Sequence, residues 1–261
     1  EDLRALRFSS ALATLESIPD HTLSQTNRRK KALLSHLVRG YQTWDLFDHM
    51  AAFDLFRNAQ EEVQSLREFN FCMRNLGRLQ SLRTTLNPKK GRVKYTEDVL
   101  ADLYNNARRR MLEGKYDDAC ARLYRLTEMC AQFVLQNKHG IDSGHVSKAQ
   151  LRDKNVPDDF IRRLTFEPPQ AGKTPVAKLG LQKSYELLSH LGEPFADFFA
   201  SSTDLEDCLA KRNQSILAHG VKPVSRETCE TFSKEVRALA VGAVCDFEDR
   251  CRDLQFPWLD T

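Results

Sequence analysis

The spacing of apolar residues is the feature that most constrains the fold of this 261-residue chain. Apolar residues recur at i, i+3 and i+4 in segment after segment, whereas runs of alternating β-branched residues are almost absent. The first spacing places apolar side chains on one face of a helix, and the second would mark a strand. The sequence therefore predicts an all-α fold. We expect helices at about residues 2–17, 24–39, 43–67, 69–84, 96–113, 116–137, 175–191, 194–200, 203–219 and 225–254, with a short one near 157–164.

Breakers divide these helices into two blocks. Pro19 and Gly40 punctuate the first helices, and residues 87–92 combine Asn-Pro, Gly and a charge cluster. We take 1–92 as an N-terminal helical block and 93–261 as a second domain. A polar stretch with Pro and Gly at about 138–174 interrupts that domain, and we expect it to pack over the core. Gly40 and Gly114 each open a segment that resembles a helical hairpin, but two imperfect copies do not make a repeat array.

The overall charge gives little indication of a partner. The chain has 39 basic and 36 acidic residues, a formal charge of +3, so any surface for a charged partner has to be local. No apolar run approaches the ~20 residues of a membrane span, and no signal peptide is visible. We expect a soluble, cytoplasmic protein. Because residues 1–17 read as a helix already under way and lack an initiator methionine, we also expect a longer polypeptide upstream.

The cysteines predict buried thiols and not a metal site. They are odd in number, they lie mostly within apolar helical runs, and no CxxC pair occurs. A zinc site needs clustered ligands at short spacing, so free thiols in a reducing compartment fit better. We expect no structural metal and no cofactor. The seven cysteines are Cys72, Cys120, Cys130, Cys208, Cys229, Cys245 and Cys251.

One helical stripe breaks the apolar pattern. In the predicted helix 203–219, at about 100° per residue, one sector of roughly 120° begins apolar and turns polar. Charged groups on a core-facing surface tend to mark functional or strained sites. The sector holds Leu205, Cys208, Leu209, Arg212, Ser215, Ile216 and His219.

Two residues of this stripe are candidates for chemistry. Arg212 and His219 are seven residues apart, about two helical turns, so both would face the same way roughly 10 Å apart along the axis. Gly220 fits the left-handed residue that ends a helix. His219 would then lie in the last turn, where unpaired carbonyls favour a protonated imidazole.

This motif resembles that of a known nuclease family. Arg212-Asn213, five intervening residues and His219-Gly220 match the signature of HEPN ribonucleases, and the text KRNQSILAHG looks like the HEPN domain of type III CRISPR-associated ribonucleases. The run YNNARRRMLEGKYDDACARLYRLTEMCAQFVL is similar to the first helical pair of the same region. The resemblance covers about Thr96 to Phe256 well and the N-terminal block more loosely. It implies a helical bundle of HEPN type, preceded by the N-terminal helical-hairpin block.

The resemblance also implies an activity. Members of this CARF-HEPN family carry a CARF sensor for cyclic oligoadenylate ahead of the nuclease; no βαβ pattern of such a sensor occurs in this chain, so we expect it upstream. The implied enzyme is a metal-independent endoribonuclease that cleaves single-stranded RNA by 2′-hydroxyl attack, as a homodimer with both motifs in one cleft.

The residues take distinct roles in that enzyme. Arg212 would hold the phosphate and His219 would orient or transfer a proton. Asn213 and Ser215 would support them, and Lys211, Arg108 and Arg109 are secondary candidates for guiding the RNA backbone.

Two other functions remain open from the sequence. A HEPN toxin held by an antitoxin would use identical chemistry under different control. A non-catalytic helical interaction module, with a vestigial motif, would bind a partner through the N-terminal block. Neither the RNA base preference nor the mode of control can be inferred from these residues.

Overall fold

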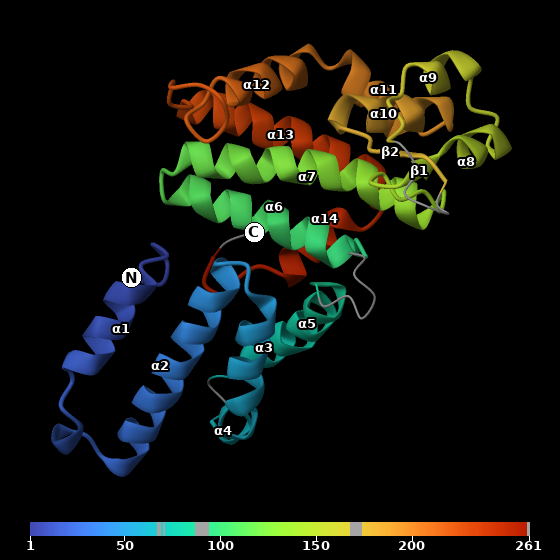
Figure 1. Ribbon diagram of the computed structural model, residues 1–261. Helices are drawn as coiled ribbons and strands as arrows, with labels where there is room; N and C mark the ends of the chain where they lie inside the picture. The colour runs from blue at the N-terminus through green and yellow to red at the C-terminus, as the bar shows by residue number, and fades with distance from the viewer. Residues whose placement is uncertain (67–68, 70, 87–93, 168–173, 260–261) are drawn as a thin grey trace. The chain divides into compact units, whose positions relative to one another are not determined.

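The computed structural model describes residues 1–66, 69, 71–86, 94–167 and 174–259 (Figure 1). Within these residues it has fourteen α-helices, one 3-10 helix and two short strands, so the predicted all-α class is confirmed. The chain forms two compact units, one of residues 1–93 and 248–261 and the other of residues 94–247. The C-terminal segment 248–261 thus groups with the first block, whereas the sequence had suggested the second. The predicted boundary segment at 87–92 lies outside the described residues.

The first unit is a set of helices around an aromatic core. Tyr41 packs edge-on against Phe56, Phe256 and Trp258, with ring centroids 4.5–5.0 Å apart. The Tyr41 hydroxyl donates a 2.7 Å hydrogen bond to Oδ1 of Asn75, so its buried polar end is satisfied. The helices are α1 (Phe8–Ser17), η1 (Asp20–Thr22), α2 (Gln25–Asp45), α3 (His49–Asn58), α4 (Gln60–Ser65), α5 (Phe71–Leu86) and α14 (Phe247–Asp253), the last of which begins in the second unit.

Three expectations for this unit were wrong. Helix α2 continues past Gly40 because this glycine lets Phe56 approach; a Cβ at position 40 would lie 2.7 Å from the Phe56 ring. The predicted helix 43–67 is instead divided between α2, α3 and α4, with Ala59 between the last two. Helix α1 begins only at Phe8, after a turn in which Arg7 N–H donates to Asp2 O.

The second unit is built around its longest helix. Helix α7 packs against α6, α13, α10 and α12, and Figure 1 shows α6, α7 and α13 side by side with α12 on the far side of α13. Gly114, at φ +72°, makes the turn between α6 and α7. The helices are α6 (Glu97–Leu112), α7 (Tyr116–Asn137), α8 (Lys148–Asp153), α9 (Asp158–Arg162), α10 (Leu181–His190), α11 (Pro194–Ser201), α12 (Thr203–Asn213) and α13 (Arg226–Ala243).

The polar stretch after α7 is more ordered than a simple connection. It holds α8, α9 and strand β1 (Val146–Ser147), which pairs antiparallel with β2 (Val176–Ala177). Because residues 176–177 form strand β2, the predicted helix 175–191 begins only at Leu181. The predicted helix 225–254 also divides, since α13 ends at Ala243 and α14 starts at Phe247.

Candidate active site

Helix α12 positions the predicted catalytic arginine at its C-terminal end. The helix begins at a Ser202 cap whose side chain accepts from Leu205 N–H at 3.1 Å. Leu205 and Leu209 are buried, which anchors the helix along one face. Arg212 lies in the last turn, where a cation complements the helix dipole.

The residues after α12 fold into a compact loop. Ser215 N–H donates to Arg212 O, His219 N–H to Asn213 O and Lys222 N–H to Gln214 O, over 3.0–3.3 Å. The loop is fixed at its far end because both oxygens of Asp117, at the start of α7, accept from Val224 N–H at 3.3 Å. The loop therefore returns the backbone of His219 to the residue that follows Arg212.

The prediction of one continuous helix through His219 was wrong. The helix ends at Asn213, and Gly220 does not have the left-handed conformation expected of it. Its role is close approach, since a Cβ at position 220 would lie 1.9 Å from Gln214 O. The helix dipole consequently acts on Arg212, and His219 lies six residues beyond the helix.

Arg212 is held in place without a counter-ion. Its guanidinium carbon lies 4.0 Å from the centre of the Tyr124 ring, and Nη1 donates to Oδ1 of Asn213 at 3.2 Å. Its Nε is buried with no hydrogen-bond partner, and within the described ranges no carboxylate pairs with it. A buried donor on a cation is costly to leave unpaired, so the site favours an anion. Burial and the Glu128 carboxylate raise the pKa of Tyr124, which Arg212 opposes, so Tyr124 is a neutral phenol at neutral pH.

His219 lies in an exposed, apolar part of the loop. Among the described residues its side chain makes no hydrogen bond or ion pair. Ile216, Leu217 and Val221 surround it in sequence and are 65, 52 and 86% exposed. An imidazole free of protein partners is available to a ligand, and clustered exposed apolar residues are typical of an interaction surface.

The two supporting residues, Asn213 and Ser215, differ in their exposure to solvent. Asn213 is exposed and contacts Arg212 directly. Ser215 is only 1% exposed and its backbone bridges to Lys222, so its position supports closure of the loop.

The three basic residues expected to guide the RNA backbone differ in burial and in their ion pairs. Lys211 is exposed but pairs with Asp207 at 2.6 Å, and Arg108 is half-buried. Arg109 is fully buried with its guanidinium 3.7 Å from Asp102, so the expectation that it guides RNA was wrong. Its charge belongs to the interior of the protein.

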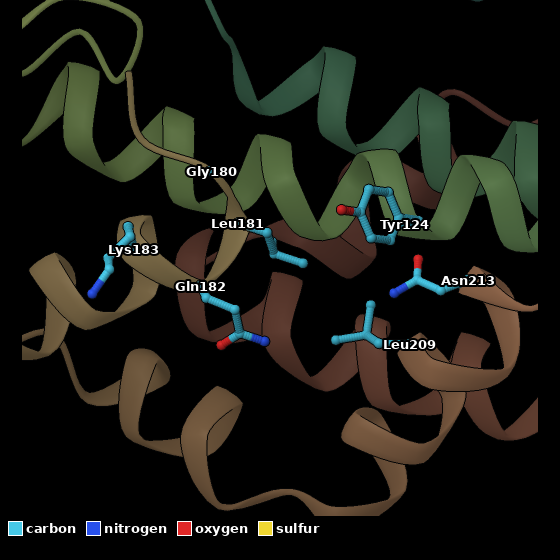
Figure 2. A pocket seen from close by; sticks show the side chains of 7 residues that line it. All are labelled: Tyr124, Gly180, Leu181, Gln182, Lys183, Leu209 and Asn213. Carbon is cyan, nitrogen blue, oxygen red and sulfur yellow. The ribbon is translucent and has the colours of Figure 1, made fainter. Parts of the chain in front are cut away.

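A pocket of about 330 Å³ adjoins the motif and was not foreseen from the sequence. Figure 2 shows Tyr124, Leu209 and Asn213 on one side of it and the residues at the start of α10 on the other. The pocket could not be predicted from the sequence, because helical periodicity does not show which helices pack against one another. Only the packing of α7, α10 and α12 brings these residues together. The lining residues are Tyr124, Gly180, Leu181, Gln182, Lys183, Leu209 and Asn213.

Six cysteines are buried as free thiols and Cys245 is exposed. Burial raises the pKa of Cys208, one turn before Arg212, to about 11, so this thiol is protonated at neutral pH. In the described part of the chain, no three His, Cys, Asp or Glu side chains gather as metal ligands. No helix among these residues is long and apolar enough to cross a membrane.

The helical bundle, with its arginine at a helix end and its histidine in the following loop, is a HEPN-type domain. Comparison with protein families supports this class: the Csm6 HEPN domain matches residues 89–242, and the Csm6 6H domain matches residues 4–81. The chain belongs to the Csm6 family of type III CRISPR-associated HEPN proteins, whose HEPN domains are generally ribonucleases. No curated protein matches the chain.

Proposed function

We propose that this protein is a metal-independent endoribonuclease that cleaves single-stranded RNA with Arg212 and His219. The observation that carries the proposal is the state of Arg212, a cation with an unpartnered buried Nε and no carboxylate partner among the described residues. RNA provides both the anion and its own nucleophile, the 2′-hydroxyl. The protein then needs only to hold the phosphate, stabilise charge and move protons.

Arg212 binds the non-bridging oxygens of the scissile phosphate. The Tyr124 ring and Oδ1 of Asn213 fix the plane of the guanidinium, which leaves its remaining N–H groups as a rigid fork for two oxygens. This interaction strengthens as negative charge develops on the phosphorane.

His219 moves a proton in the same step. The 2′-oxygen attacks phosphorus, the bond to the 5′-oxygen breaks, and the 5′-oxygen leaves as a hydroxyl with a proton. The products are a 2′,3′-cyclic phosphate and a 5′-hydroxyl. The exposed imidazole of His219 is free either to accept the 2′-hydroxyl proton or to donate to the leaving oxygen.

A second copy of the chain completes the site. One chain offers one motif histidine, whereas cleavage works best with one proton-transfer group on each side of phosphorus. Ile216, Leu217 and Val221 provide an exposed apolar surface beside it. Leu205 and Leu209 of helix α12 are already buried within the chain. The proposed two-fold contact is therefore the loop after α12 and not the helix itself.

The family suggests the biological setting. As part of the same proposal, the protein is an ancillary type III CRISPR antiviral effector, activated by cyclic oligoadenylate bound to a domain outside this chain. A HEPN toxin would use the same residues under different control. A non-catalytic module is disfavoured because burial of the Arg212 Nε without a partner costs free energy, which a bound anion would offset.

The proposal is tested by RNA cleavage with purified protein. We expect wild-type protein to produce 2′,3′-cyclic phosphate ends at the same rate with and without EDTA. His219→Ala should lose about a hundredfold in rate, the scale of one lost transition-state interaction. His145→Ala, another exposed histidine, which pairs with Asp142, is the matched control and should retain activity. Wild-type rates in His219→Ala, or activity that EDTA removes and a divalent ion restores, would contradict the proposal.

A further inference from the structure

The pocket between α7, α10 and α12 adjoins the residues that hold the phosphate. Tyr124 lines the pocket and also stacks under the Arg212 guanidinium, 4.0 Å from its ring centre. Asn213 lines the pocket and also accepts from Nη1 of Arg212. Two side chains are thus shared between the pocket and the catalytic arginine.

The lining suits a small planar ligand with polar edges. Leu181 and Leu209 provide apolar surface and Tyr124 provides an aromatic ring. Among the described residues, the amide Nδ2 of Asn213 and the Gln182 side chain have no hydrogen-bond partner. Figure 2 shows the amide nitrogen of Asn213 on the pocket side. Lys183, in contrast, has its ammonium 2.9 Å from Glu186, so it is not a free cation for the ligand.

The volume restricts the ligand further. At about 330 Å³ the pocket lies at the lower end of the roughly 300–1,000 Å³ usual for ligand sites. It has room for one base and part of its sugar but not for a duplex. Unpaired RNA bases are bound in this manner, between apolar or aromatic side chains and with hydrogen bonds to their edges.

We propose that this pocket binds the base of the nucleotide next to the cleaved phosphate and so gives the enzyme a base preference. The proposal rests on the proposed function, because it takes RNA as the substrate. A base in the pocket positions its own phosphate beside Arg212 through the shared Tyr124 and Asn213. Gln182 and Asn213 then select among bases by the donors and acceptors on the base edge.

The cleavage test fixes the scissile bond and varies one base. RNA strands that are 2′-O-methylated everywhere except at one nucleotide can be attacked at only one phosphate. The base on either side of that phosphate is changed in turn, and kcat/KM is measured for each strand. We expect wild-type protein to prefer its best base over its worst by about tenfold at one of the two positions.

Variants at Gln182 separate the pocket from the catalytic groups. Gln182→Trp, which fills the pocket, should cut the best substrate about tenfold more slowly and remove the preference. Gln182→Ala should reduce the preference for the best base over the worst several-fold. Gln64→Trp, an exposed glutamine on α4 that does not line the pocket, is the matched control and should behave as wild type. A flat base profile in wild type, or unchanged ratios in both Gln182 variants, would overturn the inference while leaving the ribonuclease assignment intact.

A binding measurement covers the case in which no strand is cleaved. Fully 2′-O-methylated RNA with 2-aminopurine at each position in turn reports base stacking by its fluorescence. If wild-type protein changes the signal at one position and Gln182→Trp does not, the pocket binds a base even though the proposed catalysis fails. Equal signals with both proteins would refute the pocket assignment.

Discussion

Replacement of Arg212 tests the central part of the mechanism, because charge and shape can be removed separately. Arg212→Ala removes the cation that binds the phosphate. We expect transition-state stabilisation to fall by about 3 kcal/mol, which is about a hundredfold in kcat/KM. Arg212→Lys keeps the charge but loses the planar fork and the stacking on Tyr124. We expect it to retain part of the activity, about tenfold below wild type.

The same substitution should affect stability very little. Arg212→Ala loses the interaction with the Tyr124 ring, about 0.5–1 kcal/mol, and a hydrogen bond to Asn213 of about 0.5–1.5 kcal/mol. It also removes the buried Nε that has no partner, a gain of about 1–3 kcal/mol. These terms largely cancel, so Tm should stay within about 2–4 °C of wild type.

The assay combines single-turnover cleavage of a labelled single-stranded RNA with thermal unfolding of each variant. Arg152→Ala is the matched control, since this exposed arginine of α8 pairs loosely with Asp158 at 3.8 Å. It should change neither measurement. Wild-type cleavage by folded Arg212→Ala protein would refute the reasoning, and so would a large drop in Tm, which would show a structural role for this side chain.

Three further outcomes follow from the loop and its surroundings. Gly220→Ala should abolish cleavage without changing helicity in circular dichroism, because the new Cβ would lie 1.9 Å from a backbone oxygen across the loop; Gly77→Ala, with open space around it, should be active. Full activity in Gly220→Ala would show that the closed loop is not required. Val221→Asp should shift the mass in light scattering from dimer to monomer and lower activity, whereas Leu46→Asp, at a similarly exposed site, should do neither. A fully active monomer of the unaltered chain would exclude the composite site. Iodoacetamide at pH 8 should leave Cys208 unmodified in mass spectra, since the pKa of its buried thiol is about 11; rapid alkylation there would contradict this.

The sequence determined the helical class and the position of most helices. Apolar spacing identified α7 at its observed bounds, Tyr116–Asn137, because a long buried helix must keep its period throughout. Apolar spacing did not predict the helix end at Ala59, where no proline or glycine stops the helix. It also did not predict that α2 continues through Gly40. Those ends depend on contacts such as that of Phe56, which lie far away in sequence.

The sequence by itself also marked Arg212 and His219 as candidates, through their spacing and the family motif that they match. Only the tertiary structure decided that the backbone of His219 returns to Asn213, the residue after Arg212. Helical periodicity describes contacts within about one turn. The loop that contains His219 depends instead on the close approach of Gly220 to the Gln214 carbonyl and on the hydrogen bond from Val224 N–H to Asp117 of α7. The pocket likewise forms from three helices, because packing places side chains side by side that no local pattern connects.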